Sequence, residues 1–307
     1  MFAYAVRRLG SAIPTLFIVV TVAFFMMRVA PGGPFDREKQ LPPEIEANIL
    51  KVYHLDKPLH QQYFDYISNI VRGDFGPSFK YLDFTVTDLI LAGFPVSLRL
   101  GLAAILIAVI VGVTAGTIAA LKQNSTFDYM VMGLAMTGIA IPNFVMAPLL
   151  ALIFGVYLSW LPVAGWNGGA MQYQVLPIIT LALPQIAYIA RLTRGSMVET
   201  MHSNFIRTAR AKGLAEKIVV VRHALKGGLL PVVSYLGPAT AAVITGSVVI
   251  EAIFDVPGIG RYFVTGALNR DYPVVMGVVI FYGVLIIALN LVVDLIYGFL
   301  DPRVKVE

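Results

Sequence analysis

Long apolar runs separated by short polar segments dominate the sequence. A helix needs about 20 apolar residues to cross about 30 Å of hydrocarbon. The runs that reach this length are Leu9–Met27, Leu100–Leu121, Val131–Tyr157, Tyr173–Ala190, Val232–Ile250 and Val274–Val293. This pattern predicts an all-α integral membrane protein with about six transmembrane helices.

The third and fourth runs come from one charge-free region, which we divide at residues 157–169. Pro, Gly and Trp residues in that segment favour a turn at the level of the lipid headgroups. Two prolines interrupt each of these helices: Pro142 and Pro148, then Pro177 and Pro184. A packing kink is the ordinary explanation of any one proline, but their clustering in adjacent helices favours helices that line a path.

The chain divides into three parts. Residues 1–30 form a retained signal-anchor helix, because the apolar run is too long for a cleaved signal peptide. Residues 31–98 form a loop with two helical patterns, at 41–55 and 57–73, which predict an ordered helical cap. Residues 99–307 form a core of five further membrane helices, with a polar loop at about 194–228.

Small residues recur at every fourth position of the second run. They are Ala104, Ala108, Gly112, Gly116 and Ala120. Such a stripe lets another helix approach closely, and Gly112 with Gly116 makes a GxxxG pair. The sequence leaves open whether the partner helix belongs to this chain or to another.

Composition and charge placement agree with the apolar pattern. The chain is 58% hydrophobic and 13% charged, with a mean hydropathy of +0.78 and a formal net charge of +5. The basic residues lie between apolar spans, which excludes a nucleic-acid-binding domain. On a six-helix arrangement they gather on one face: Arg7, Arg8, Lys122, the block Arg191–Lys226, Arg303 and Lys305. The positive-inside rule then puts both termini in the cytoplasm.

Enzyme chemistry is missing from the sequence. It contains no P-loop, HExxH or GxSxG motif, no Cys, and no spacing of its four His that suggests a metal site, so we identify no catalytic and no metal-ligating residue. The middles of the spans hold essentially no ionisable residue, and Glu251 and Asp294 fall at helix ends, where we expect them to be hydrated. If the chain moves a substrate, the energy comes from elsewhere.

The basic segment 204–231 predicts a helix–Gly–helix hairpin on the cytosolic surface. Ser203 or Asn204 caps the first helix, and Gly213 ends it in a left-handed conformation. A second helix, Ala215 to Lys226, stops at the Gly pair that follows it, and Pro231 opens the next span. Charge alone favours a simple positive-inside anchor. A short helix with small alanines and a sharp end also suits insertion into a groove of a partner protein.

The residues of this segment resemble a known family. "RTARAKGL" (207–214) and "RHAL" (222–225) are similar to the cytoplasmic coupling loop of binding-protein-dependent ABC importer permeases, in particular the oligopeptide, dipeptide and nickel group and its B-type membrane subunits. The resemblance runs nearly end to end, through residues 7–35, 73–81, 94–101, 192–214, 244–275 and the closing "DPR" at 301–303.

The resemblance implies an ATPase-coupling helix in this chain. Its residues would be Arg207, Thr208, Ala209, Arg210, Ala211, Lys212 and Gly213, with support from Arg222 and His223. The broad importer motif begins Glu-Ala-Ala, whereas Arg207, Thr208 and Ala209 stand here, and Lys-Gly-Gly (226–228) replaces a frequent Pro. These departures put a role for an acidic residue, and the end of the second helix, in question.

The resemblance also implies partners and a location. The chain would be the membrane subunit of an ATP-driven peptide importer in the bacterial inner membrane, in contact with lipid and with peptide substrate. It would assemble with a homologous second permease subunit, two cytosolic ABC ATPase subunits and a periplasmic peptide-binding protein. ATP and Mg would bind the ATPases, and this chain would hold no cofactor.

Two alternatives stay open on the sequence. One is an ATP-independent channel or secondary carrier, which the proline-rich third and fourth helices satisfy halfway. The other is a membrane scaffold without transport, which leaves the basic hairpin unexplained. The candidate path-lining regions are Tyr129–Ala190 and Ser234–Ser247. The cargo, whether peptide or nickel, is also open.

Overall fold

A computed structural model describes residues 2–29, 56–81 and 83–300, and the elements of these ranges are helices. The long ones are α1 (Phe2–Val29), α4 (Val86–Leu121), α7 (Met171–Met201), α11 (Leu230–Gly246) and α14 (Tyr272–Leu300). The shorter ones are α3 (Leu59–Val71), α5 (Thr126–Ala140), α6 (Asn143–Leu150), α8 (Asn204–Ala211), α9 (Glu216–Ile218), α10 (Leu225–Gly228), α12 (Val248–Ile253) and α13 (Ile259–Leu268). π-helical turns occupy Ala151–Tyr157 and Val219–Ala224, and a 3₁₀ turn occupies Asn167–Gly169.

Five stretches of helix are long and apolar enough to cross a membrane. They are Gly10–Met27, Val86–Leu121, Met171–Met201, Leu230–Ile253 and Tyr272–Val293. A sixth span is present if the bent pair Thr126–Ala140 and Asn143–Tyr157 crosses as one unit. The prediction of an all-α membrane protein with about six spans is therefore confirmed for the described part of the chain.

The third span departs most from its prediction. Instead of one kinked helix, it consists of two helical pieces that bend by 104° at Ile141–Pro142. Pro142 has no N–H to continue the helix and disfavours helical backbone at the residue before it, so Ile141 is extended (φ −86°, ψ 118°). By contrast, α7 runs without a break through Pro177 and Pro184. Only one of these prolines therefore ends a helix.

The second span begins earlier than expected. Its helix starts at Val86 rather than near Leu100, because Thr85 and Asp88 form a reciprocal capping box. Residues 86–98, which the sequence analysis assigned to the outer loop, are thus the first turns of α4.

The loop between α1 and α4 is partly described. The expected helix at 41–55 lies outside the described residues, and α3 corresponds to the helix expected at 57–73. α3 rests on α1: the hydroxyls of Thr21 and Tyr63 lie 2.7 Å apart, and Phe24 contacts the rings of Tyr63 and Tyr66. The second half of the predicted cap therefore folds back onto the first membrane helix.

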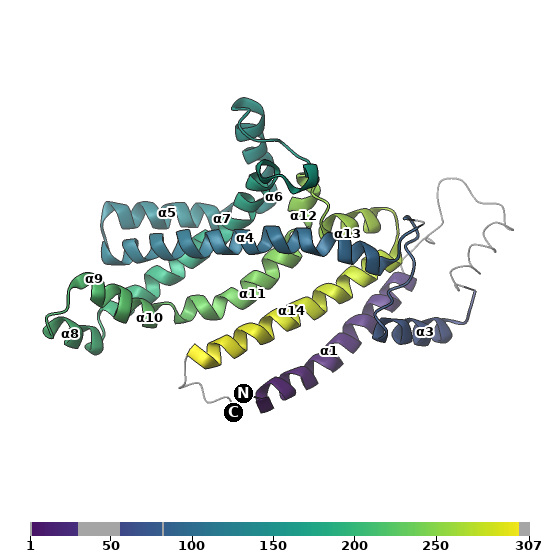
Figure 1. Cartoon of the computed structure of the whole chain (residues 1–307), viewed down its shortest axis with the longest axis horizontal. Coiled ribbons are helices and arrows are strands. Elements are labelled where there is room, and N and C mark those ends of the chain that lie inside the picture. Colours follow the sequence, from purple (N-terminus) through teal and green to yellow (C-terminus); the bar gives the residue numbers. More distant parts are fainter. Residues whose placement is uncertain (1, 30–55, 82, 301–307) are drawn as a thin grey trace.

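Several short helices lie at the two ends of the bundle (Figure 1). α8, α9 and α10 lie at one end, while α3 and α13 lie at the other (Figure 1). α1 begins and α14 ends toward the end that carries α8 (Figure 1). The first and last spans therefore start and finish on the same side.

The small-residue stripe of α4 lies against α7. A Cβ on Gly112 would come within 2.8 Å of the Ile189 side chain, and one on Gly116 within 2.7 Å of the Thr193 Cβ. Ala104 and Ala108 of the same stripe are fully buried. The partner of the stripe is thus a helix of the same chain, and the two backbones approach closely because these glycines have no side chain.

This contact predicts opposite effects of one added methyl group at two glycines. Gly116→Ala should lower the free energy of unfolding by about 1–3 kcal/mol, because the methyl group overlaps the backbone and side chain of α7. Gly133→Ala in α5 meets nothing within 4 Å and should be neutral or gain up to about 1 kcal/mol from helix propensity. Denaturant titration in mild detergent measures both. Equal denaturation midpoints for Gly116→Ala and Gly133→Ala would contradict the close packing of α4 on α7.

Candidate functional site

The basic segment forms a hairpin directly after α7. α8 ends at Ala211, and Gly213 follows with φ +74°, as the sequence predicted for a left-handed residue at this turn. Ser203 occupies the N-cap position, but its hydroxyl donates to the carbonyl of Thr200 (2.6 Å) instead of capping α8. Two residues, His202 and Ser203, separate α7 from α8, so the hairpin has almost no slack relative to the membrane helix.

The inner face of the hairpin is a small apolar core. Ile206 and Ala209 of α8 are buried against Val219, Val220 and Ala224 of the second arm, and Met197 of α7 and Ala120 of α4 complete the cluster. Ala209 was expected on the docking surface. It is only 4% exposed and faces inward, so its small side chain sets how closely α8 lies on the second arm.

The outer face is polar and basic. The other residues of the expected coupling helix are exposed there: Arg207, Thr208, Arg210, Ala211, Lys212 and Gly213. Arg210 makes a two-pronged ion pair with Glu216 across the turn, at 3.1 and 2.6 Å, which lowers the pKa of the Glu216 carboxyl. Phe205 adds a large apolar side chain that is 51% exposed. Phe205 and Ala209 are four residues apart in α8, and only the fold separates their exposures.

The second arm differs from its prediction at its end. Helical structure continues through Gly227 and Gly228 to α11, with a single residue, Leu229, between α10 and α11. Gly228 is buried because the Met197 side chain of α7 lies where a Cβ would be, at 2.6 Å. α10 therefore ends at the second glycine rather than before the pair, and Gly228 lets this arm pass close to α7.

The two support residues sit on the π-helical part of that arm. Arg222 is exposed, and His223 is partly buried with its Nδ1 3.4 Å from the Ile218 carbonyl oxygen. Neither reaches the ion pair of the turn by any bond in the described residues, and Arg222 adds to the basic surface.

A second ion pair ties α7 to α5 near the hairpin. Arg194 donates from Nε and Nη2 to the two oxygens of Asp128, both at 2.6 Å, and the backbone N–H of Asn124 donates to the same carboxylate. The Asp128 side chain is 1% exposed. This pair is not predictable from the sequence, because Asp128 and Arg194 are 66 residues apart and each looks like an ordinary charge at a span end.

Glu251 was expected to be hydrated at a helix end, and this expectation is wrong. The residue is fully buried, and its carboxylate accepts hydrogen bonds from the Ser247 hydroxyl (2.5 Å) and the Gly260 N–H (2.8 Å). The loop between α12 and α13 folds back over Glu251. This burial cannot be predicted from the residues next to Glu251 in the sequence. Its bonds are thus satisfied inside the protein, as burial of a polar group requires.

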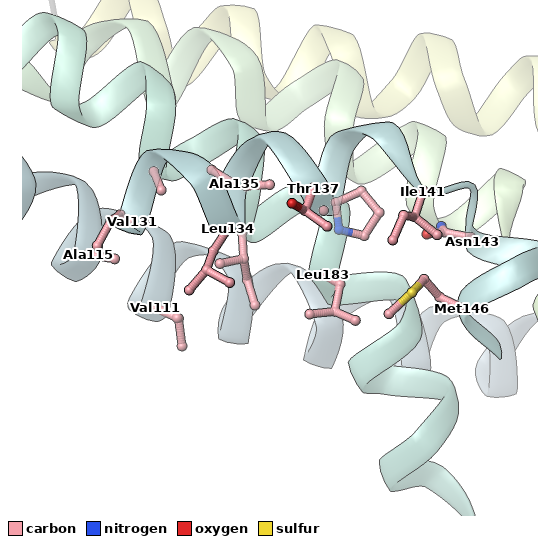
Figure 2. Close-up of a pocket in the computed structure, with 15 residues that line it drawn as sticks. Val111, Ala115, Val131, Leu134, Ala135, Thr137, Ile141, Asn143, Met146 and Leu183 are labelled. Atoms are coloured by element: carbon pink, nitrogen blue, oxygen red, sulfur yellow. The ribbon is translucent and has the colours of Figure 1, made fainter. Parts of the chain in front are cut away.

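An apolar pocket of about 390 Å³ lies where α5 bends into α6. Figure 2 shows its wall of Val111, Leu134, Leu183 and Met146, with Thr137 and Asn143 as polar members. No charged side chain lines it. The pocket at the bend thus offers no charged side chain to an ion.

The surface of α7 and α11 differs from that of the other spans. Large apolar side chains are exposed on the others, for example Leu106 of α4 (61%), Ile13 of α1 (70%) and Leu134 of α5 (68%). Along all of α11, and along α7 after Met171, no large apolar side chain is exposed. The exposed positions are instead small or polar: Gln172, Arg191, Gly195 and Glu199 of α7, and Pro231, Ser234, Pro238 and Ala242 of α11. Such a surface suits water better than lipid.

Comparison with known proteins adds the family. Residues 112–306 match the family described as "Binding-protein-dependent transport system inner membrane component", and residues 1–103 match the N-terminal domain of the same components. The chain belongs to this family. It is therefore a membrane permease subunit of an ABC transport system and not itself an enzyme, and family membership implies ATPase and substrate-binding partners.

Curated relatives cover the whole chain. It is 58% identical over 305 residues to the oligopeptide transport system permease protein OppB of Salmonella typhimurium, covering 99% of this chain and 100% of the relative. It is 53% identical over 305 residues to OppB of Haemophilus influenzae, with the same coverage. It is 46% identical over 307 residues to the dipeptide transport system permease protein DppB of Bacillus subtilis, covering 100% of this chain and 99% of the relative.

Solved structures support the fold. The chain is similar to a subunit of the MetNI methionine ABC transporter in an inward-facing conformation, with a TM-score of 0.57 and 16% identity over 69% of this chain and 96% of that one. An amino acid ABC transporter crystallised with histidines gives a TM-score of 0.54 at 15% identity, over 69% and 94% of the two chains. The resemblance read from the sequence is thus confirmed at the level of the family and the fold.

Proposed function

We propose that this chain forms one half of the translocation path of an ATP-driven peptide importer and couples that path to a cytosolic ATPase. The observation that carries the proposal is the hairpin of α8 and its second arm: packed on one face, exposed and basic on the other, and joined to α7 by two residues. The relatives named as oligopeptide and dipeptide permeases support peptide as the cargo.

The partners follow the same proposal. A homologous second permease supplies the other half of the path, two ABC ATPases bind ATP and Mg and take the coupling helices in their grooves, and a periplasmic binding protein delivers the peptide. The exposed ring of Phe205 beside the basic residues suits such a groove, because buried aromatic anchors dominate protein interfaces. This chain holds no cofactor.

Movement reaches the membrane through rigid connections. A displacement of α8 acts on α7 through the short link and the shared core at Met197. It acts on α5 through the Arg194–Asp128 ion pair. ATP binding would bring the ATPases together, shift both hairpins and open the path outward. Reopening of the ATPases would return the path to the inward-facing state.

The rival function is a secondary carrier, which would need ion-ligating groups at a broken helix. The bent third span offers an apolar pocket instead.

The path itself is assigned to the free faces of α7 and α11. Small and polar residues there are exposed at the surface of the described helices, and a second permease opposite them would enclose water. Within the candidate region Ser234–Ser247, the exposed Ser234, Pro238 and Ala242 therefore belong to the path, while the exposed part of α7 lies just after the candidate region Tyr129–Ala190. α5 presents Leu134 and Met136 to lipid.

The hairpin end is assigned to the cytoplasm of a bacterial inner-membrane protein, together with both termini. Because the chain has no cysteine, single cysteines report the side of each loop without background. Lys217→Cys in the hairpin should react with a membrane-impermeant maleimide only after the cells are opened. Asp56→Cys, exposed at the opposite end, should react in cells whose outer membrane alone is permeabilised. The reverse pattern would overturn the orientation.

The coupling role is tested at the turn of the hairpin. Gly213→Val forces a β-branched residue into φ +74°, at a cost of about 1–2 kcal/mol, and should change how α8 is presented. We expect peptide uptake to fall at least about fivefold, with weaker retention of the ATPase during purification. The measurement is uptake of labelled peptide at equal levels of membrane-inserted protein.

A matched control separates coupling from backbone strain. Gly73 has φ +78° at the other end of the molecule, and like Gly213 it has nothing within 4 Å of an added Cβ. Gly73→Val should lower stability by a similar amount but leave the ATPase bound. If both variants lost uptake and ATPase alike, the loss would come from general strain, and the coupling role of the turn would be wrong.

A further inference from the structure

Four side chains where α7 meets α11 form a connected array, in which Arg191 is exposed and Gln185, Tyr188 and Tyr235 are half-buried. The guanidinium of Arg191 lies 5.2 Å from the ring centroid of Tyr188. Tyr188 stacks on Tyr235 of α11, with centroids 5.8 Å apart and an interplanar angle of 29°. The Tyr235 hydroxyl donates to Oε1 of Gln185 at 2.8 Å, so Tyr235 contacts two residues of α7. A cation, two aromatic rings and an amide are thus held side by side.

Arg191 has a free binding edge. Among the described residues it makes no ion pair and no hydrogen bond, and its side chain is exposed. Arg194, one turn further along α7, is by contrast fully engaged with Asp128. The contact with the Tyr188 ring positions the Arg191 guanidinium and leaves its N–H groups open, and a guanidinium with open N–H groups can bind a carboxylate in a bidentate manner.

Arg191 lies at the end of the apolar part of α7 that is nearer the hairpin, directly after the run Tyr173–Ala190. It is ten residues before the end of α7, about 15 Å along the helix axis from Met201. An exposed cation at such a position is found facing water or a partner group rather than lipid. The amide nitrogen of Gln185, whose oxygen is already bonded, likewise has no partner among the described residues.

We propose that Gln185, Tyr188, Arg191 and Tyr235 form a contact site for the C-terminal carboxylate and last peptide bond of the cargo. The inference rests on the proposed function, since it places a peptide on the path between α7 and α11. Arg191 pairs with the carboxylate, the amide of Gln185 donates to the adjacent peptide carbonyl, and the tyrosine rings cover the main chain. Each of these groups recognises a feature that all unmodified peptides share, so the site is independent of cargo sequence.

The test compares two forms of one peptide in the complete transporter, reconstituted with its ATPases and binding protein. Uptake of trialanine is measured as the free acid and as the C-terminal amide, which lacks the carboxylate charge. For Arg191→Gln we expect uptake of the free acid to fall about tenfold, the value of a charge-assisted bond, with uptake of the amide changed less than about twofold. Any preference of the binding protein itself cancels, because the same protein serves every variant.

Two further variants complete the design. Arg191→Lys keeps the positive charge but lacks the planar guanidinium, and it should lower uptake of the free acid roughly threefold without changing uptake of the amide. This variant replaces Arg191→Gln in the comparison if the Gln variant does not assemble. Arg72→Gln, at an exposed arginine after α3, should change neither peptide. ATP hydrolysis measured in parallel reports whether each complex is intact.

The outcomes separate this inference from the function on which it rests. Equal losses for acid and amide in the Arg191 variants would make the residue structural, and unchanged uptake of both would remove it from the path; either result overturns the site alone. If the wild-type complex hydrolyses ATP but imports neither form of the peptide, peptide import itself is wrong. A loss confined to the free acid supports both.

Discussion

The close approach of α4 and α7 is the constraint on which the rest of the structure depends. Gly112 and Gly116 bring the two backbones together where any side chain would overlap Ile189, Ala190 or Thr193. This contact fixes the rotation of α7 about its own axis. Because one face of α7 is committed to α4, the opposite face, with Tyr188 and Arg191, is left toward α11 and the open side of the subunit.

α7 thereby connects the two working parts of the molecule. Its membrane portion carries the polar array, and its last turn leads within two residues to the hairpin. Met197 is buried in the hairpin core, and Arg194 holds α5 through the buried carboxylate of Asp128. A push on the outer face of α8 is thus transmitted to helices of the path through packed contacts, not through a flexible loop. That arrangement explains why a basic, helix-prone segment sits in the middle of so apolar a chain.

Local signals allowed much of this to be predicted, and non-local contacts account for the failures. The spans, the hairpin and the left-handed Gly213 follow from apolar length, charge and turn chemistry, which neighbouring residues determine. The inward orientation of Ala209 depends on the second arm, and the burial of Glu251 depends on the segment that leads from α12 into α13. Likewise, four prolines look alike in sequence, yet only Pro142 ends a helix, because context decides which lost hydrogen bond is replaced.

The central claim, that the outer face of α8 docks on an ATPase, is tested most directly by site-directed photocross-linking. Ala211→Cys, exposed on that face and introduced into a cysteine-free chain, would carry a benzophenone maleimide in native membranes. Docking of α8 on the ATPase predicts one major adduct, with a P-loop ATPase identified by mass spectrometry, and no ATPase adduct from the same probe on Asp56→Cys at the opposite end. An adduct with lipid alone from position 211, or an ATPase adduct from position 56, would contradict it.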